Sequence, residues 1–205
     1  MENNYVKISG VVEEPMQISY ENRGEKFYEG FIRVNRNSGA TDIIPVTIPE
    51  KLAPNGIAQC FITVEGEFRS FNKIVNEKSK LMLTLFAKSI VENRSEKHEN
   101  IIKLHGFICK QPVYRETPLG KQICDILFAV NRRNHKSDYL PIITWGSLAE
   151  TARDLTVGTE LEIEGRVQSR EYQKNGETKI AYEISANFVQ PPELEFEPLE
   201  EIDLW

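Results

Sequence analysis

The chain has 205 residues, of which 40% are hydrophobic and 27% are charged, and its formal net charge is −6. These proportions suit a folded protein of two domains of roughly 100 residues each, and no stretch approaches the roughly 18 apolar residues that a membrane span needs. The N-terminal segment MENNYVKISG has no apolar signal core, so we expect a cytoplasmic protein. The acidity is local, because the last sixteen residues contain six acids and no base and the rest of the chain has 25 basic and 25 acidic residues.

An internal repeat with an offset of 96 residues organises the chain. The segment NYVKISGVVEEP resembles NIIKLHGFICKQP, FIRVNR resembles LFAVNR, and SGATDIIPVTI resembles HKSDYLPIIT. Further on, ITVEGEFRS resembles LEIEGRVQS at an offset of 99, which matches Gly66 with Gly165. The polar run ENRSEKHEN, residues 92–100, predicts a linker between the two copies.

Two features of the first copy involve proline. The segment PEKLAPNG has Pro54 where a helix would continue, so we expect one helical turn there at most. Pro45, and Pro141 at the matching place in the second copy, interrupt strand-like segments. Because proline donates no ladder hydrogen bond, we expect a bulged third strand in both copies.

The second copy predicts five strands, near residues 101–109, 121–132, 138–145, 159–172 and 178–189. Turn signals occur at residues 117–120 and at Asn175-Gly176. The segment SLAETARDL begins with a capping box, Ser147 to Glu150, and predicts a helix that ends near Gly158.

A helix between the third and fourth of five strands is the OB-fold arrangement, so we expect an all-β protein of two tandem five-stranded OB-fold barrels. The expected division is a divergent OB-fold domain at 1–97, a second OB-fold domain at 98–190 and a disordered acidic tail at 191–205.

The second copy also carries aromatic and basic residues of the kind that hold single-stranded nucleic acid, by stacking on bases and by contacts to the backbone. Tyr139 and Trp145 lie six apart on one strand and therefore on one face, and Arg166, Arg170 and Tyr172 share a face of the fourth strand. The turns contribute further cations, namely Arg132, Arg133, Lys136, Arg115 and Lys121, with His135 among them. Together these residues predict one binding surface.

Each of these groups also has a purely structural interpretation. Tyr139 and Trp145 would equally fill the barrel, because alternation alone does not identify the inward face. The arginines of the fourth strand continue a face with Glu160, Glu162 and Glu164, which is typical of a solvated strand. Cations in turns are commonly ordinary surface residues.

Residues 100–190 resemble the bacterial single-stranded DNA-binding protein family. The motifs NIIKLHG, TPLGKQICDILFAVNR, SDYLPIITWGSLAE and GTELEIEGRVQSREY follow the family's order and spacing. The resemblance implies stacking by Tyr139, Trp145 and Tyr172 and basic contacts from Arg132 or Arg133 and from Arg170. It further implies sequence-independent binding and protection of single-stranded DNA in replication, recombination and repair, in a nucleoid-associated homodimer that presents four OB domains.

The first copy departs from this pattern. At the positions of Tyr139 and Trp145 it has Ile43 and Pro49, so those stacking residues are absent. The first copy still has part of the predicted binding surface, namely one aromatic residue and four cations. These are Phe71, Arg33, Arg36, Arg69 and Lys73. We expect this copy to bind weakly or to serve in assembly.

The C-terminal sequence EEIDLW resembles the acidic tip of the same family, which docks replication and repair proteins, although Trp stands where Phe is usual and the preceding stretch is short. The expected partner-binding residues are Glu200, Glu201, Asp203, Leu204 and Trp205. The acids would contact basic residues around a pocket of the partner protein, and the last two side chains would fill that apolar pocket. An ordinary acidic terminus, or one that folds back on its own barrel, stays open.

The remaining motifs argue against catalysis. Cys60, Cys109 and Cys124 form no CxxC pair and no zinc pattern with the histidines, so we expect reduced core thiols and no metal or other cofactor. No P-loop, HExxH or GxSxG motif is present, which disfavours an enzyme. The competing functions are a specialised primosomal or phage or plasmid recombination accessory protein, an RNA-binding OB protein, and an OB pair that binds only protein.

Overall fold

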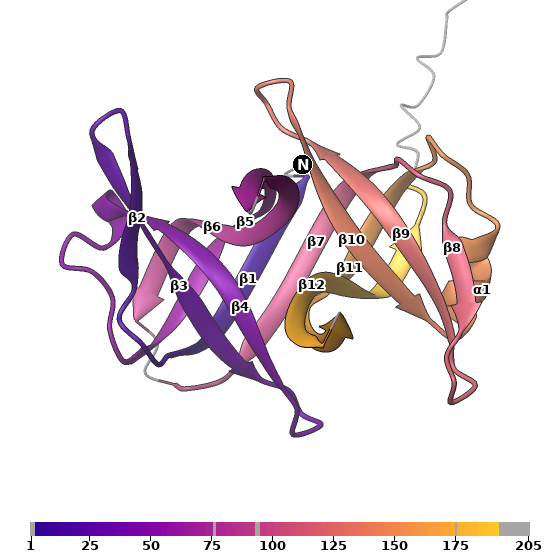
Figure 1. Cartoon of the computed structure of the whole chain (residues 1–205), viewed down its shortest axis with the longest axis horizontal. Helices are drawn as coiled ribbons and strands as arrows, with labels where there is room; N and C mark the ends of the chain where they lie inside the picture. The colour runs from indigo at the N-terminus through magenta and orange to yellow at the C-terminus, as the bar shows by residue number, and fades with distance from the viewer. Residues whose placement is uncertain (1–2, 76, 93–94, 175, 193–205) are drawn as a thin grey trace, which may run out of the picture.

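The computed structural model describes residues 3–75, 77–92, 95–174 and 176–192, and their strands form two barrels that share one continuous sheet (Figure 1). The first half consists of β1 (Asn4–Val12), β2 (Gln17–Asn22), β3 (Glu25–Asn35), β4 (Thr41–Pro49), the 3-10 turn η1 (Glu50–Leu52), β5 (Cys60–Val75) and β6 (Lys78–Glu92). The second half consists of β7 (Glu99–Ile108), β8 (Val113–Glu116), β9 (Gln122–Asn131), β10 (Ser137–Trp145), α1 (Ser147–Arg153), β11 (Glu160–Lys174) and β12 (Glu177–Gln190).

Each half closes a five-stranded barrel. The first has the strand order β3-β4-β6-β5-β1 and is closed by the pairing of β3 with β1. The second has the matching order β7-β11-β12-β10-β9 and is closed by the pairing of β7 with β9. The predicted pair of OB-fold barrels is thus confirmed, while β2 and β8 are additional edge strands that the sequence did not predict.

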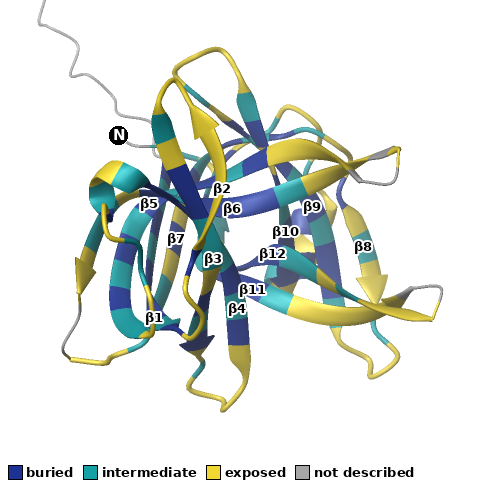
Figure 2. Cartoon of the chain, turned by 60° about the vertical axis from the view of Figure 1, so that its left-hand side comes forward, coloured by how far each residue is buried: buried dark blue, intermediate teal, exposed yellow. Residues whose placement is uncertain are grey.

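The barrel interiors are filled by alternating apolar side chains. Ile44, Val46 and Ile48 point inward from β4 and are at most 1% exposed. Phe68 and Phe128 are fully buried and are the largest such side chains of the two halves. Full burial of side chains of this kind stabilises the fold by about 1.5–3 kcal/mol each. Figure 2 shows this buried band along the middle of the strands, with exposed residues at the hairpin ends.

The two halves meet about a pseudo-two-fold axis. Strands β1 and β7 pair antiparallel, and Val6 lies directly opposite Ile102, the residue that matches it in the repeat. Because equivalent residues face each other at this point, contacts on one side of the axis recur on the other. The side-chain amide of Asn4 bonds the backbone of Phe68 in the first half, and Asn100 bonds Val167 in the same way in the second.

The helix lies where it was predicted but begins differently. Helix α1 starts at Ser147 after Gly146, and no side chain caps it. The Gly146 carbonyl accepts the amides of Ala149 and Glu150, and the Glu150 carboxylate instead accepts a hydrogen bond from the Gln122 side chain at 2.9 Å. The capping-box prediction is therefore wrong, and the helix ends at Arg153 rather than near Gly158. The prediction of one turn at most in the first half is confirmed by η1.

The predicted bulge in the third strand of each barrel is also wrong. Pro45 pairs with Phe31 and Pro141 pairs with Leu127, both without a shift of register. On its other side, β10 pairs with β12 only at Ile142 and Ile143, and β4 pairs with β6 at the matching positions. This leaves each proline beside an unpaired stretch of strand edge, where a missing N–H costs no ladder hydrogen bond.

The thiols and the acidic residues form no metal site in the described part of the chain. Cys124 is buried as predicted, whereas Cys60 and Cys109 are half-buried, and burial raises the pKa of all three thiols. Among the described residues, no three His, Cys, Asp or Glu side chains are grouped so that they could hold a metal ion. No helix in those same ranges has the length and hydrophobicity needed to cross a membrane.

Candidate nucleic-acid interface

Strand β10 carries aromatic side chains on its outer face. Leu140, Ile142 and Thr144 are at most 2% exposed and point into the barrel. Tyr139 and Trp145 have the opposite parity and are 46% and 40% exposed. The structure thus excludes the interpretation in which these two rings fill the barrel. Large rings held outward on a rigid strand can stack against planar ligands.

Strand β11 adds an aromatic and a cation to the same half. Tyr172 is 36% exposed, and the Arg170 guanidinium lies 5.9 Å from the centre of its ring. The Arg170 Nε also donates to Glu183 at 3.3 Å. The guanidinium stays about half exposed in this pair, so it can meet an anionic ligand beside the ring.

Arg166, also on β11, has different surroundings. It lies near Arg36 and Asp42 of the first half, and its Nη2 donates to Gln168 at 3.0 Å. Burial and then repulsion from Arg36 lower the pKa of Arg166. Arg166 therefore belongs to the junction between the halves, whereas Arg170 belongs to the open surface.

Arg132 bonds groups at the junction of the two halves. Its guanidinium forms an ion pair with Asp138, with one bond from Nε at 2.7 Å, and donates to the Ser70 carbonyl at 2.9 Å. Asp138 is 1% exposed and also accepts the Ser70 amide at 2.5 Å. The hydrogen bonds of Arg132 thus join β10 to the β5–β6 hairpin of the other half.

On the other side of the pseudo-two-fold axis, an arginine and a buried aspartate make the same kind of contact with the opposite hairpin. Arg36 forms an ion pair with Asp42, which is fully buried and accepts the Ser169 amide at 2.9 Å. The hydroxyl of Ser169 in turn accepts the amide of Ile43 at 2.9 Å. Each half therefore holds the long hairpin of the other.

The remaining predicted cations of the second half occupy turns and edges. Arg115 pairs with Asp125 across β8 and β9 at 2.8 Å, and both side chains are about half exposed. Arg133 and Lys136 are exposed in the β9–β10 turn, and Lys121 is exposed in the β8–β9 turn. These cations lie around the sheet that carries Tyr139 and Trp145.

The first half lacks the outward rings of β10 at the matching positions, where it has Ile43 and Pro49. Phe71 is 42% exposed on β5, and the strand register places it opposite Met82, as Arg170 lies opposite Ala181. Lys73 therefore occupies the position of Tyr172. Three predicted cations of this half have carboxylate partners: besides Arg36 with Asp42, Arg33 pairs with Glu13 at 2.5 Å and Arg69 pairs with Glu67 at 2.7 Å.

Two residues that the sequence argument did not single out lie beside these candidates. Phe31 is 54% exposed on the outer face of β3, opposite Pro45, and alternation with the buried Ile32 and Val34 would have revealed its orientation. Lys88 contacts Glu67 at 2.6 Å. It is the extra residue of a β-bulge in β6, which the sequence pattern did not show.

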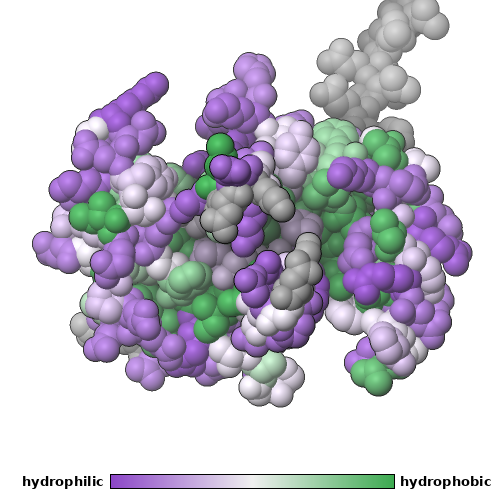
Figure 3. Space-filling model, in the orientation of Figure 1, coloured by the Kyte–Doolittle hydropathy of each residue, from purple (hydrophilic) through white to green (hydrophobic). Residues whose placement is uncertain are grey.

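The face of the molecule seen in Figure 3 is mainly hydrophilic, with hydrophobic groups confined to small patches between polar side chains. The predicted partner-binding residues Glu200, Glu201, Asp203, Leu204 and Trp205 lie outside the described residues.

Taken together, the fold and this surface define a tandem OB-fold protein with outward aromatic and basic side chains. The family model described as "Single-strand binding protein family" matches residues 99–192. Single-stranded DNA-binding protein 2 of Streptococcus agalactiae is 31% identical over 98 residues, which span 44% of this chain and 75% of that protein. Single-stranded DNA-binding protein 3 of Clostridium acetobutylicum is 35% identical over 99 residues, which span 44% of this chain and 69% of that protein.

The relatives above match the second half of the chain, whereas solved structures have a similar fold over both halves. The wild-type single-stranded DNA-binding protein of Thermus aquaticus superposes with a TM-score of 0.72 at 22% identity, covering 93% of both chains. A deletion mutant of the same protein gives a TM-score of 0.71 at 21% identity and covers 96% of this chain. On the evidence of the family model and the relatives, this chain belongs to the single-strand binding protein family.

Proposed function

We propose that this protein binds and protects single-stranded DNA, without reading its sequence, in replication, recombination and repair in the cytoplasm. The observation that carries the proposal is the outward orientation of Tyr139 and Trp145 on β10, together with the exposed Tyr172 and its neighbour Arg170 on β11 of the same half. Every base has a face that stacks on an aromatic ring, so such a surface accepts any sequence. The family relationship supports the same function.

The binding residues in this proposal fall into two groups. Tyr139, Trp145 and Tyr172 stack on bases. The cations that contact the backbone are Arg170, Arg133, Lys136, Arg115 and Lys121, with Arg132 and Arg166 at the junction and Arg33, Arg36, Arg69 and Lys73 in the first half, where Phe71 adds a ring. Cations already paired with carboxylates contribute less, because a phosphate would have to compete with an existing ion pair.

The test is tryptophan fluorescence during titration with oligo-dT, because Trp145 and Trp205 are the two tryptophans of the sequence. We expect quenching by the single strand and none by a duplex of equal length. Trp145→Ala should lose most of the quenching and weaken binding by about 1–3 kcal/mol, which is about 5- to 150-fold. Trp145→Phe keeps a ring and should retain most of the affinity.

Two results would contradict this proposal. No response of the wild-type chain to any single strand would leave a pair of OB domains that binds only protein. Tighter binding to an RNA strand of the same sequence, lost when the 2′-OH is removed, would make RNA the ligand.

We further propose the division into domains at 1–97 and 98–190, with residues 191–205 recruiting replication and repair proteins. Strand β6 ends at Glu92 and β7 begins at Glu99, which supports a boundary in the polar run between them. We propose a homodimer, so that four OB domains act together. Sedimentation equilibrium should then give twice the chain mass of 23.6 kDa, and a mass of one chain would refute the dimer.

A further inference from the structure

The first barrel carries a groove on its outer surface, formed by two adjoining cavities of about 220 and 310 Å³. Glu29 and Phe31 of β3 line both cavities, so the two spaces adjoin along this strand. The smaller cavity extends between β4 and the β5–β6 hairpin and reaches Tyr182 of the second half. The larger one extends toward the turn between β1 and β2, where Glu13 and Glu14 line it.

The smaller cavity is apolar. Phe31 and Phe71, which are 54% and 42% exposed, line it together with Met82 and Tyr182. In Figure 3, a small hydrophobic patch lies over β3 and β4 and is bordered by polar side chains. Pockets for small ligands commonly have about 300–1,000 Å³, so a cavity of about 220 Å³ suits one large side chain better than a whole small molecule.

The rim of the groove is acidic. The charged residues of its lining are Glu13, Glu14, Glu29 and Arg33, so three carboxylates and one guanidinium give a formal charge of −2. Arg33 is paired with Glu13 at 2.5 Å. Within the described residues, neither Glu14 nor Glu29 forms an ion pair. Carboxylates of this kind beside an apolar cavity attract cationic side chains and repel phosphate.

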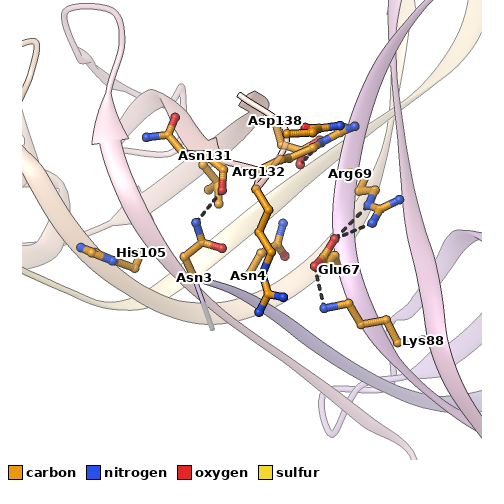
Figure 4. Close-up of a pocket in the computed structure, with 12 residues that line it drawn as sticks. Asn3, Asn4, Glu67, Arg69, Lys88, His105, Asn131, Arg132 and Asp138 are labelled. Carbon is orange, nitrogen blue, oxygen red and sulfur yellow. Dashed lines mark hydrogen bonds and ion pairs between the residues drawn. The ribbon is translucent and has the colours of Figure 1, made fainter. Parts of the chain in front are cut away.

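Arg69, two residues before Phe71 on β5, does not offset this charge. It lines neither cavity of the groove. Its guanidinium donates to Glu67 at 2.7 Å, and Figure 4 shows this pair in the wall of a separate polar cavity between the two halves. The same guanidinium lies 3.9 Å from the centre of the Phe86 ring. Arg69 therefore stabilises the packing of the hairpin and is not part of the groove.

The matching surface of the second barrel has a different chemical character. The repeat and the strand registers replace Glu14 by Lys110, Ile43 by Tyr139 and Phe71 by Arg170. The second barrel thus has an exposed ring and two cations where the first has a carboxylate and two apolar side chains. The first of these surfaces suits a nucleic-acid backbone, and the second suits a ligand that is itself apolar and basic.

Glu29 and its counterpart Asp125 also differ in their neighbours. Asp125 pairs with Arg115 of β8 at 2.8 Å. The register of β2 puts Tyr20 at the place of Arg115, and the Tyr20 ring stacks on Phe27 with the ring centres 4.7 Å apart. A ring has therefore replaced the arginine, so Glu29 lacks the cation that Asp125 has.

We propose that this groove docks a segment of a partner protein that combines large apolar side chains with lysine or arginine. One apolar side chain would enter the smaller cavity beside Phe31 and Phe71, and the basic side chains would reach Glu29 and Glu14 along the larger one. The first barrel would then recruit protein on the surface that corresponds to the proposed DNA-binding surface of the second. Phe71 belongs to both surfaces of the first half, so a docked segment would withdraw that ring from DNA.

The test is fluorescence anisotropy of a dye-labelled peptide, Phe-Leu-Lys-Lys between glycines, titrated with the full chain. One comparison peptide has Phe-Leu-Glu-Glu, and the other has Ser-Ser-Lys-Lys. We expect the first peptide to bind about tenfold tighter than either comparison, because one lacks the ion pairs and the other lacks the apolar contact. Equal binding of the lysine and glutamate peptides would refute the role of the acidic rim and with it the proposal.

Three variants locate the binding. Glu14→Gln with Glu29→Gln should abolish the preference for lysine over glutamate, and Phe31→Ala should weaken binding of the lysine peptide about tenfold. The matched control is Leu127→Ala, because Leu127 has the place of Phe31 in the second barrel, and it should leave the peptide affinity unchanged. Thermal unfolding verifies that the variants are folded, and the glutamine variant, with Glu14 exposed and Glu29 half-buried, tests the groove independently of Phe31.

Oligo-dT titration of the same variants distinguishes the two occupants that the groove could have. We expect Phe31→Ala to bind oligo-dT as the wild type does, since Phe31 is not among the proposed DNA-binding residues. If this variant loses affinity for oligo-dT and keeps its affinity for the peptide, the groove is a DNA surface and the docking proposal is wrong. The proposal also fails if the wild type binds no peptide. Failure of the wild type to bind oligo-dT would instead refute only the proposed function.

Discussion

Asp138 shows how one buried carboxylate determines what its neighbours can do. It is 1% exposed, pairs with Arg132 and accepts the Ser70 amide from the other half. Removal of one partner of a buried ion pair leaves the other charge uncompensated, which costs far more than loss of an exposed pair. The junction therefore depends on this carboxylate more than on any exposed ion pair of the surface.

We predict that Asp138→Asn lowers the free energy of unfolding by about 3 kcal/mol, measured by urea denaturation. The matched control is Asp125→Asn, because Asp125 pairs with Arg115 where both side chains are about half exposed, and it should cost less than about 1 kcal/mol. Equal losses for the two variants would show that the Asp138 pair does not stabilise the junction.

At the residue scale, the sequence identified Tyr139 and Trp145 as a pair but could not decide which way they point. Alternation fixes which residues share a face, and only the closed barrel identifies the inner one. The sequence likewise grouped Arg132 with the turn cations, because its pairing with Asp138 and Ser70 depends on a hairpin from the other half. Contacts between segments far apart in the chain leave no local pattern.

At the element scale, the strands were predictable because their apolar residues alternate and turn residues separate them. The five predicted strands of the second half match β7, β9, β10, β11 and β12 to within a few residues at each end. The errors arose where tertiary contacts compete with local rules. The side chain of Glu150 bonds Gln122 rather than closing a capping box, and Pro141 lies beside an unpaired strand edge rather than at a bulge.

The crossing hairpins allow a paired prediction. The Ser70 hydroxyl accepts the Tyr139 amide, and the Ser169 hydroxyl accepts the Ile43 amide. Ser169→Ala should raise the hydrogen-exchange rate of the Ile43 amide by about fivefold, equivalent to about 1 kcal/mol, and leave that of Tyr139 unchanged. Ser70→Ala should do the reverse, so each variant is the control for the other. A similar change at both amides in either variant would mean that the hairpins open together.

At the scale of the whole molecule, the repeat made the architecture predictable and hid its asymmetry. Two copies at an offset of 96 residues indicate two similar barrels, and the direct pairing of Val6 with Ile102 then generates a pseudo-two-fold junction. The positions at which the copies differ acquire meaning only when that junction is known. Lys88 and Asn187 are unremarkable in sequence, yet they occupy equivalent bulges on opposite sides of the axis.

The charge distribution of the chain leads to the last prediction, which concerns residues 193–205. These residues carry all six acids of the C-terminal segment and no base, so we expect them to compete with DNA for cations. Deletion of 193–205 should leave the affinity for oligo-dT unchanged or slightly higher, with the largest gain at low salt, and should abolish recruitment of replication and repair proteins. Fluorescence titration through Trp145 measures the first effect, since that tryptophan remains after the deletion. Loss of DNA binding on deletion would mean that the acidic segment supports the DNA-binding surface, and the proposed division between a binding body and a recruiting tail would be wrong.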